Sequence, residues 1–173
     1  MKKRYPRTLS TGANNTVIAL SETEVGKIFS GDTRSDIGSE AEKMKFANKI
    51  NDLVVKFIRL DVYGKDAEML VMERLYPHDF RAYEYEKREL WLDVFEDELK
   101  QLHGAGFVHH DLRRSSNEPG LSYDNIFLTA TGIRLIDVGI SALESQLGER
   151  LFKRYVEQEW KEFEEFRKFL VNR

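Results

Sequence analysis

GFVHHDLRRSSNEPGLSYDNIFLTATGIRLIDVGI, residues 106–140, contains two short apolar runs that each end in an aspartate. FVHHD ends at Asp111, IRLID ends at Asp137, and Asn125 directly precedes a third apolar run, IFL. One aspartate after an apolar run is often only a turn or cap residue. Two such acids and an amide within one stretch instead suit a bound metal ion or phosphate, because hard cations take oxygen ligands. We therefore predict a polar site at the ends of these strands.

Composition limits the classes of protein that the chain can be. Its 173 residues suit one domain or two small lobes that share a cleft, and 41% hydrophobic with 33% charged residues argue against disorder. The absence of cysteine excludes disulfides and thiolate chemistry, and a net charge of -3 gives no reason to expect a nucleic-acid ligand. MKKRYPRTLS carries no apolar run of a signal peptide, and no segment is long enough to span a bilayer. We expect no membrane contact and a cytoplasmic location.

Hydrophobic patterning in the first part of the chain predicts strands around one helix. Residues 17–29 predict a hairpin, VIAL and EVGKIF joined by SETE. Residues 39–51 predict a helix capped by Ser39, with Glu42 three residues further on. Residues 53–75 predict two further strands around a Tyr-Gly-Lys-Asp turn.

The second part of the chain changes to helical spacing. Residues 82–103 place leucines and a phenylalanine three and four positions apart, and the tail from residue 141 predicts helix to its end, interrupted at Gly148. The predicted fold class is therefore α+β, with a β-rich lobe over residues 1–75 and a mostly helical lobe over residues 76–173. A cleft between two unlike lobes is a common ligand site.

The order of the motifs resembles that of the protein kinases. STGANNTV resembles their glycine-rich loop and retains Gly12 of three glycines, and EVGK places Lys27 at the position of the strand lysine. LVMERL resembles the segment that leads into the hinge. HHDL resembles the catalytic HRDL and carries Asp111, YDNIFL carries the metal-binding Asn125, and IDVG resembles DFG with Asp137. The resemblance covers roughly residues 8–140 and implies a two-lobed kinase-like fold.

The resemblance also implies a role for each matched residue. Asp111 is expected to orient or accept the proton of the acceptor hydroxyl, and Asn125 and Asp137 are expected to hold Mg²⁺. Lys27 is expected to contact the ATP phosphates and to pair with Glu42, although Glu42 also suits a helix-capping role. The positions implied for the nucleotide are Gly12, Val17, Lys27, Glu42, Glu73, Leu75 and Phe127, with Glu73 and Leu75 offering backbone groups to adenine.

A polar insert separates the catalytic aspartate from the asparagine. The gap from Asp111 to Asn125 is about nine residues longer than in HRDLxxxN, and RRSSNEPGLS, residues 113–122, fills it. Three interpretations are open: Arg113 and Arg114 contact substrate, Ser115 and Ser116 are phosphorylated by the chain itself, or the insert is a tolerated surface loop.

Two other departures indicate a reduced kinase. His110 replaces the arginine of HRDL, and only 36 residues follow Asp137, with no APE motif. We therefore do not expect control by activation-loop phosphorylation. In this respect the chain resembles minimal atypical kinases, such as the RIO family and the small kinase of the KEOPS assembly.

The expected activity is transfer of the γ-phosphate of MgATP to a hydroxyl, with serine or threonine of a protein as acceptor. An ATPase and a small-molecule kinase are close variants. The alternative from another class is a kinase-shaped pseudoenzyme that acts through a partner. The aromatic side chains of the tail, Tyr155, Trp160, Phe163 and Phe166, either dock on such a partner or pack on the helical lobe.

Overall fold

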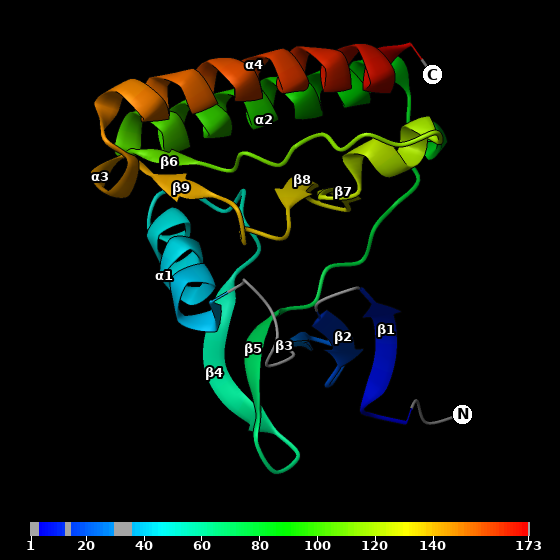
Figure 1. Ribbon diagram of the computed structural model, residues 1–173. Coiled ribbons are helices and arrows are strands. Elements are labelled where there is room, and N and C mark those ends of the chain that lie inside the picture. The colour runs from blue at the N-terminus through cyan, green and yellow to red at the C-terminus, as the bar shows by residue number, and fades with distance from the viewer. Residues whose placement is uncertain (1–3, 13–14, 30–35, 173) are drawn as a thin grey trace.

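The computed structural model describes residues 4–12, 15–29 and 36–172. Its first half is built on a five-stranded antiparallel sheet with the order β1-β2-β3-β5-β4. The strands are β1 (Arg7–Thr11), β2 (Asn15–Ala19), β3 (Glu24–Phe29), β4 (Phe57–Tyr63) and β5 (Ala67–Glu73). The helix α1 (Ile37–Asn48) lies between this sheet and the rest of the molecule (Figure 1). The predicted hairpin is confirmed by the pairing of β2 with β3, which sets Val17 opposite Lys27.

The N-terminus of α1 differs from the sequence prediction. Asp36 caps the helix, with its Oδ1 accepting a hydrogen bond of 2.9 Å from the Gly38 N–H, so Ser39 was wrong as the cap and lies inside the first turn. An N-cap needs an extended backbone and a side-chain oxygen, and Asp36 supplies both before the helix begins. The helix therefore begins about one turn earlier than predicted, and Ser39 is its third residue.

The connection from α1 to β4 links the two halves of the molecule. The predicted strand began at Leu53, but β4 begins at Phe57. Residues 53–55 instead bond to the second half, because Val55 N–H donates to Leu135 O at 2.8 Å and Leu135 N–H donates to Leu53 O at 2.7 Å. The predicted strand is therefore confirmed over residues 57–63, whereas residues 53–55 are buried and bond to the second half.

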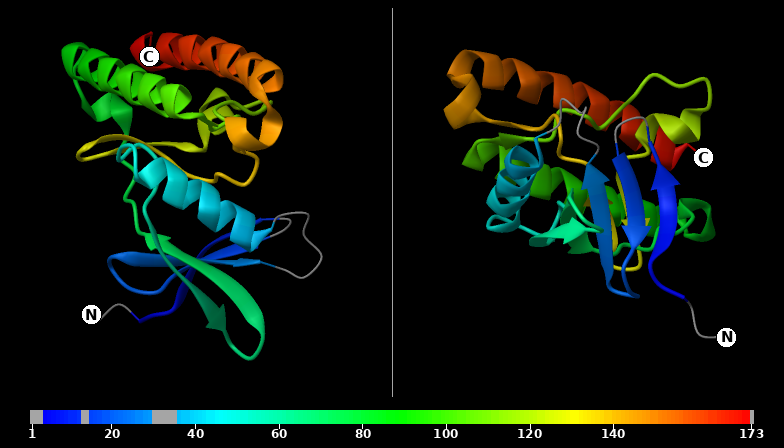
Figure 2. Two further views of the ribbon diagram at one scale, coloured as in Figure 1. Left: turned by 90° about the vertical axis from the view of Figure 1, so that its left-hand side faces the viewer. Right: turned by 60° about the horizontal axis from the view of Figure 1, so that its bottom comes forward.

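The second half is mostly helical. Two long helices, α2 and α4, lie side by side and cover a layer of short strands (Figures 1 and 2). The elements are η1 (Phe80–Ala82), α2 (Tyr85–Ala105), β6 (Phe107–Val108), η2 (Pro119–Tyr123), β7 (Ile126–Thr129), β8 (Gly132–Leu135), β9 (Ala142–Leu143), α3 (Glu144–Leu147) and α4 (Glu149–Val171). The predicted helix over 82–103 is confirmed as α2, and the break at Gly148 is confirmed, with φ of 81° between α3 and α4. The two-residue strand β9 was not predicted.

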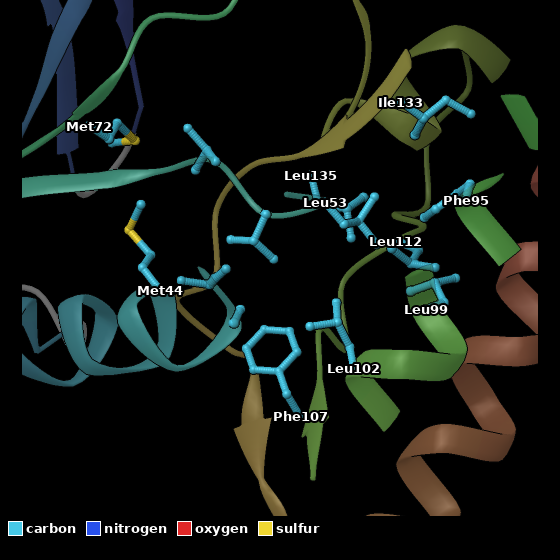
Figure 3. Packing of buried hydrophobic residues seen from close by; sticks show 14 of the residues in the cluster. Met44, Leu53, Met72, Phe95, Leu99, Leu102, Phe107, Leu112, Ile133 and Leu135 are labelled. Atoms are coloured by element: carbon cyan, nitrogen blue, oxygen red, sulfur yellow. The ribbon is translucent and has the colours of Figure 1, made fainter. Parts of the chain in front are cut away.

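A continuous apolar core joins the two halves. Figure 3 shows Met44 of α1 on the left, Phe95 and Leu99 of α2 on the right, and Leu53 and Leu135 between them. Such contiguous packing fixes the relative position of side chains that reach the interface from either half. Among the described helices, none combines the length and apolar character needed to cross a membrane.

The apolar side of α4 packs inside the molecule. Phe163 and Phe166 are buried, and their rings lie 5.3 and 5.9 Å from the ring of Phe95 on α2. These two side chains form part of the core, so a partner that docks on the tail must contact other residues of α4.

Candidate active site

A buried ion network lies where the sheet meets the helical half. Lys27 of β3 donates from Nζ to Glu40 Oε1 at 2.8 Å and to Asp137 Oδ1 at 3.3 Å. The side chains of Lys27 and Glu40 are only 7% and 3% exposed. A buried lysine needs such partners, because an unpaired charge away from water is strongly unfavourable. The network brings together three segments that are far apart in the sequence.

The expectation that Glu42 pairs with Lys27 is wrong. Glu42 lies on the outer face of α1, 72% exposed, and pairs with Lys45 at 3.3 Å. The helical period explains the difference, since Glu40 lies four residues before the buried Met44 and shares its face, whereas Glu42 points away. Burial raises the pKa of the Glu40 carboxyl, against the opposing effect of the Lys27 charge.

Two residues beside the network have an unusual backbone conformation. His110 and Asp137 have φ of 65° and 57°, the left-handed region that non-glycine residues rarely adopt. The surrounding structure holds both in place: His110 donates its N–H to Glu159 Oε1 at 2.7 Å, and Gly139 N–H lies 3.3 Å from Asp137 Oδ1. Backbone strain of this kind clusters at functional sites.

A second set of bonds connects the segment around Asp111 to the segment around Asp137. His109 is fully buried, and its Nε2 lies 2.9 Å from the carbonyl oxygen of Ile136. Ser141 Oγ donates to the carbonyl oxygen of His109 at 2.9 Å. His109 therefore has a structural role. These bonds fix the segments that carry Asp111 and Asp137 relative to each other.

Asp111 and Asn125 contact each other directly. Asn125 donates from Nδ2 to Asp111 Oδ2 at 2.8 Å and to its carbonyl oxygen at 3.0 Å. This leaves Asn125 Oδ1 directed at other partners. The structure therefore brings together Lys27, Asp111, Asn125 and Asp137, as the sequence predicts.

The two aspartates have opposite pKa shifts. Burial raises the pKa of Asp111, although Arg114 and the hydrogen bond from Asn125 oppose the shift. Burial also favours the neutral form of Asp137, but the Lys27 charge and the hydrogen bond from Gly139 outweigh it and lower the pKa of Asp137. Two carboxyl groups with pKa values moved apart suit different tasks, one as proton acceptor and one as a permanent anion.

The two arginines of the insert after Asp111 point in opposite directions. Arg113 turns to the outside, where its Nε lies 3.0 Å from Glu165 Oε2 on α4. Arg114 turns inwards, and its Nη2 lies 3.3 Å from Asp111 Oδ2, 3.2 Å from Asn125 Oδ1 and 3.6 Å from Asp137 Oδ2. This position of Arg114 was not predicted by any motif.

The oxygens of the site fit a magnesium ion that is bound mainly by phosphate and water. In the described ranges, no group of three or more His, Cys, Asp or Glu side chains could hold a metal ion alone. Asp137 and Asn125 supply two hard oxygens, and Mg²⁺ is commonly held by one or two protein ligands together with substrate phosphates. The oxygens of Asp137 and Asn125 thus fit a cation that binds together with nucleotide phosphates.

Glu159 of α4 holds the segment around Asp111 and was missed by the sequence analysis. It is 1% exposed, accepts from the His110 N–H, and its Oε2 lies 2.6 Å from His103 Nε2. The ring of His110 stacks on Tyr155 at 3.7 Å between centroids. A signal was present in the sequence, because Glu159 falls on the helical face of Phe152, Phe163 and Phe166.

The other residues expected at the nucleotide lie on or just after strands of the sheet, or on β7. Glu73 ends β5, and its N–H already donates to Lys56 O at 3.0 Å, so only its carbonyl group is left as a candidate for adenine. The Glu73 carboxylate accepts from Lys56 N–H and pairs with Arg134. Val17 and Leu75 pack against the core as partly buried side chains, and Phe127 is half-buried on β7. Gly12 donates its N–H to Asn15 O at 2.8 Å, which closes the end of the β1–β2 hairpin.

Comparison with known proteins supports the protein-kinase-like fold that the sequence resemblance implies. No protein-family model matches the sequence, and no curated protein matches it. Among solved structures, the chain is similar to the kinase PK-1 of Cydia pomonella granulovirus, with a TM-score of 0.57 and 15% sequence identity. The likeness covers 79% of this chain and 53% of that kinase, so this chain matches about half the length of its neighbour. The chain therefore has a protein-kinase-like fold.

Proposed function

We propose that the chain is an ATP-dependent phosphotransferase that moves the γ-phosphate of MgATP to a serine or threonine hydroxyl. The observation that carries the proposal is the joint placement of the Lys27–Glu40–Asp137 network and the Asp111–Asn125 pair at one interface. Each of these groups supplies a part that phosphoryl transfer requires, and they come from five separate segments of the chain. A bound Mg²⁺ would neutralise the developing charge on the phosphates.

The side chains of the chain divide the work between binding and proton transfer. Lys27 binds phosphate oxygens as a point charge, and Glu40 fixes its ammonium group. Asp137 and Asn125 offer Oδ atoms to the cation. Asp111 accepts the proton of the acceptor hydroxyl, the hydroxyl oxygen bonds to the γ-phosphorus, and the bond from that phosphorus to the bridging oxygen breaks to release ADP. Its raised pKa favours this role, because the carboxylate becomes a stronger proton acceptor.

We propose two lobes, one over residues 1–75 and one over residues 76–173. Adenine would then bind near the connection between them, at Leu75. We further propose a place among minimal atypical kinases, as the RIO and KEOPS resemblance implies. The support is the arrangement after Asp137, where α3 and α4 follow almost at once and α4 itself contacts the Asp111 segment through Glu159.

The direct test of the activity is incubation of the chain with ATP labelled at the γ-phosphate and mixed protein acceptors. We expect Mg²⁺-dependent label on serine or threonine. Label released only as inorganic phosphate would instead support the ATPase variant, and label on a small molecule would support a small-molecule kinase. ATP that binds without transfer or hydrolysis would favour the pseudoenzyme.

Glu40 and Glu42, on opposite faces of α1, allow a matched pair of variants. Glu40→Gln is expected to weaken ATP binding about tenfold to a hundredfold, because it removes a charge-assisted bond of about 1.5–3 kcal/mol that positions Lys27. Glu42→Gln removes the same charge from the exposed face of the same helix and is expected to leave affinity unchanged. Calorimetric titration of ATP with Mg²⁺ measures both. Equal affinities in the two variants would refute the role of Glu40.

A further inference from the structure

Arg114 places one guanidinium nitrogen among the oxygens that a metal would need. Its Nη2 lies within 3.6 Å of an oxygen from each of Asp111, Asn125 and Asp137. Two of these atoms, Asn125 Oδ1 and Asp137 Oδ2, belong to the residues proposed as metal ligands. The other oxygen of Asp137 faces Lys27, so both of its carboxylate oxygens are next to a cation of the chain.

The charges of the site are nearly balanced without any added ion. Asp111, Asp137 and Glu40 carry the negative charge at the interface, and Lys27 and Arg114 carry the positive charge. A divalent cation that approached Asp137 would meet both positive groups within a few ångströms, where unit charges interact by about 4 kcal/mol at an effective dielectric constant near 20. Metal binding is therefore disfavoured as long as Arg114 stays in this position.

The insert fixes the backbone of Arg114 but leaves its side chain able to move. Arg114 N–H donates to Ser122 O at 2.8 Å, which folds the insert back on itself beside the site. The Arg114 side chain is 43% exposed, and its Nε lies 3.5 Å from Asp124 Oδ1 at the rim. A half-exposed arginine can turn towards solvent or phosphate without opening the core.

We propose that Arg114 is an internal counter-ion that competes with the divalent cation for Asn125 and Asp137. The inference rests on the proposed function and names a regulation of the same site. In the free protein Arg114 neutralises the acidic side chains. When MgATP enters, Arg114 leaves these oxygens and the triphosphate supplies a new negative partner for it. The insert thereby makes metal binding depend on the nucleotide.

Manganese binding to the nucleotide-free full chain tests this competition without any measurement of activity. Mn²⁺ takes hard oxygen ligands as Mg²⁺ does, and its free concentration can be followed by electron paramagnetic resonance. Arg114→Gln is expected to tighten Mn²⁺ binding about tenfold, equivalent to about 1.4 kcal/mol, and Arg114→Lys to tighten it less. Adding Asp137→Asn to Arg114→Gln should abolish the gain.

Arg113→Gln is the matched control. It removes the same charge from the adjacent residue, whose side chain pairs with Glu165 outside the site. Its Mn²⁺ affinity should equal that of the unmodified chain, and circular dichroism should show all variants folded. A general charge effect would tighten binding in both arginine variants and overturn the proposal.

The failure of this inference differs from failure of the proposed function. If Arg114→Gln and the unmodified chain bind Mn²⁺ equally, and Asp137→Asn removes binding from both, the competition is refuted and the metal site stands. If no variant binds Mn²⁺ through Asp137, with or without ATP, both the inference and the proposed function are overturned.

Discussion

Asp111→Asn is expected to lower phosphate transfer about 10²–10⁴-fold and to raise the thermal midpoint at pH 7. The first effect follows from removal of the proton acceptor, which contributes on this order to catalysis. The second follows from burial, which raises the pKa of Asp111 in the folded chain. Folding then favours the protonated carboxyl, so the contribution of Asp111 to stability is fully present below its unfolded pKa and is lost as pH rises through its folded pKa. At pH 7 the ionised group opposes folding, and asparagine removes that effect.

The pH dependence separates this account from a general loss of structure. The excess stability of Asp111→Asn should shrink as pH falls towards the unfolded pKa of aspartate, and the acid limb of the rate profile should lie above the ordinary carboxyl value of 3.8. Asp97→Asn removes a charge from the exposed surface of α2 and should change neither quantity. Transfer at the unmodified rate in Asp111→Asn would show that Asp111 is not the proton acceptor.

Glu159→Ala is expected to have the largest effect on stability, a loss of about 3–5 kcal/mol in the free energy of unfolding. The substitution leaves the buried His103 and the His110 N–H without their shared acceptor. The same loss should lower phosphate transfer, because the backbone next to Asp111 is held by this bond. Urea denaturation measures the stability, and calorimetry measures whether ATP binding remains.

Two companion variants make the Glu159 result specific. Glu159→Gln keeps an oxygen that can accept from the His110 N–H, so it should recover part of the stability. Glu164→Ala lies on the exposed side of the same helix and should change the unfolding free energy by less than about 0.5 kcal/mol. Equal stabilities of Glu159→Ala and Glu164→Ala would refute the role given to Glu159.

The sequence predicts the parts of the site that lie on or shortly after strands. Lys27, Asp111, Asn125 and Asp137 each belong to a short apolar run with a polar residue at a fixed place, and the structure brings all four together. The order of these runs is sufficient for the fold class as well. Local sequence patterns show where each residue lies along its strand. Pairing of the strands then brings these residues together.

The parts that were missed depend on a helix face or on long-range contact. Glu40 lies four residues before Met44 and therefore on the interior face of its helix, but the kinase resemblance assigned the pairing with Lys27 to Glu42. Glu159 carries no motif, because its partners His103 and His110 lie about fifty residues earlier. Arg114 belongs to an insert whose path only the folded chain shows. Spacing places Glu40 and Glu159 on buried helix faces, but neither propensity nor spacing shows which residues they contact.

Calorimetric titration of ATP into the purified chain, with and without Mg²⁺, tests the central claim most directly. The account predicts saturable binding that strengthens with Mg²⁺ and loses this dependence in Asp137→Asn. Absence of binding at millimolar nucleotide, or binding to which Mg²⁺ and Asp137 make no difference, would contradict it.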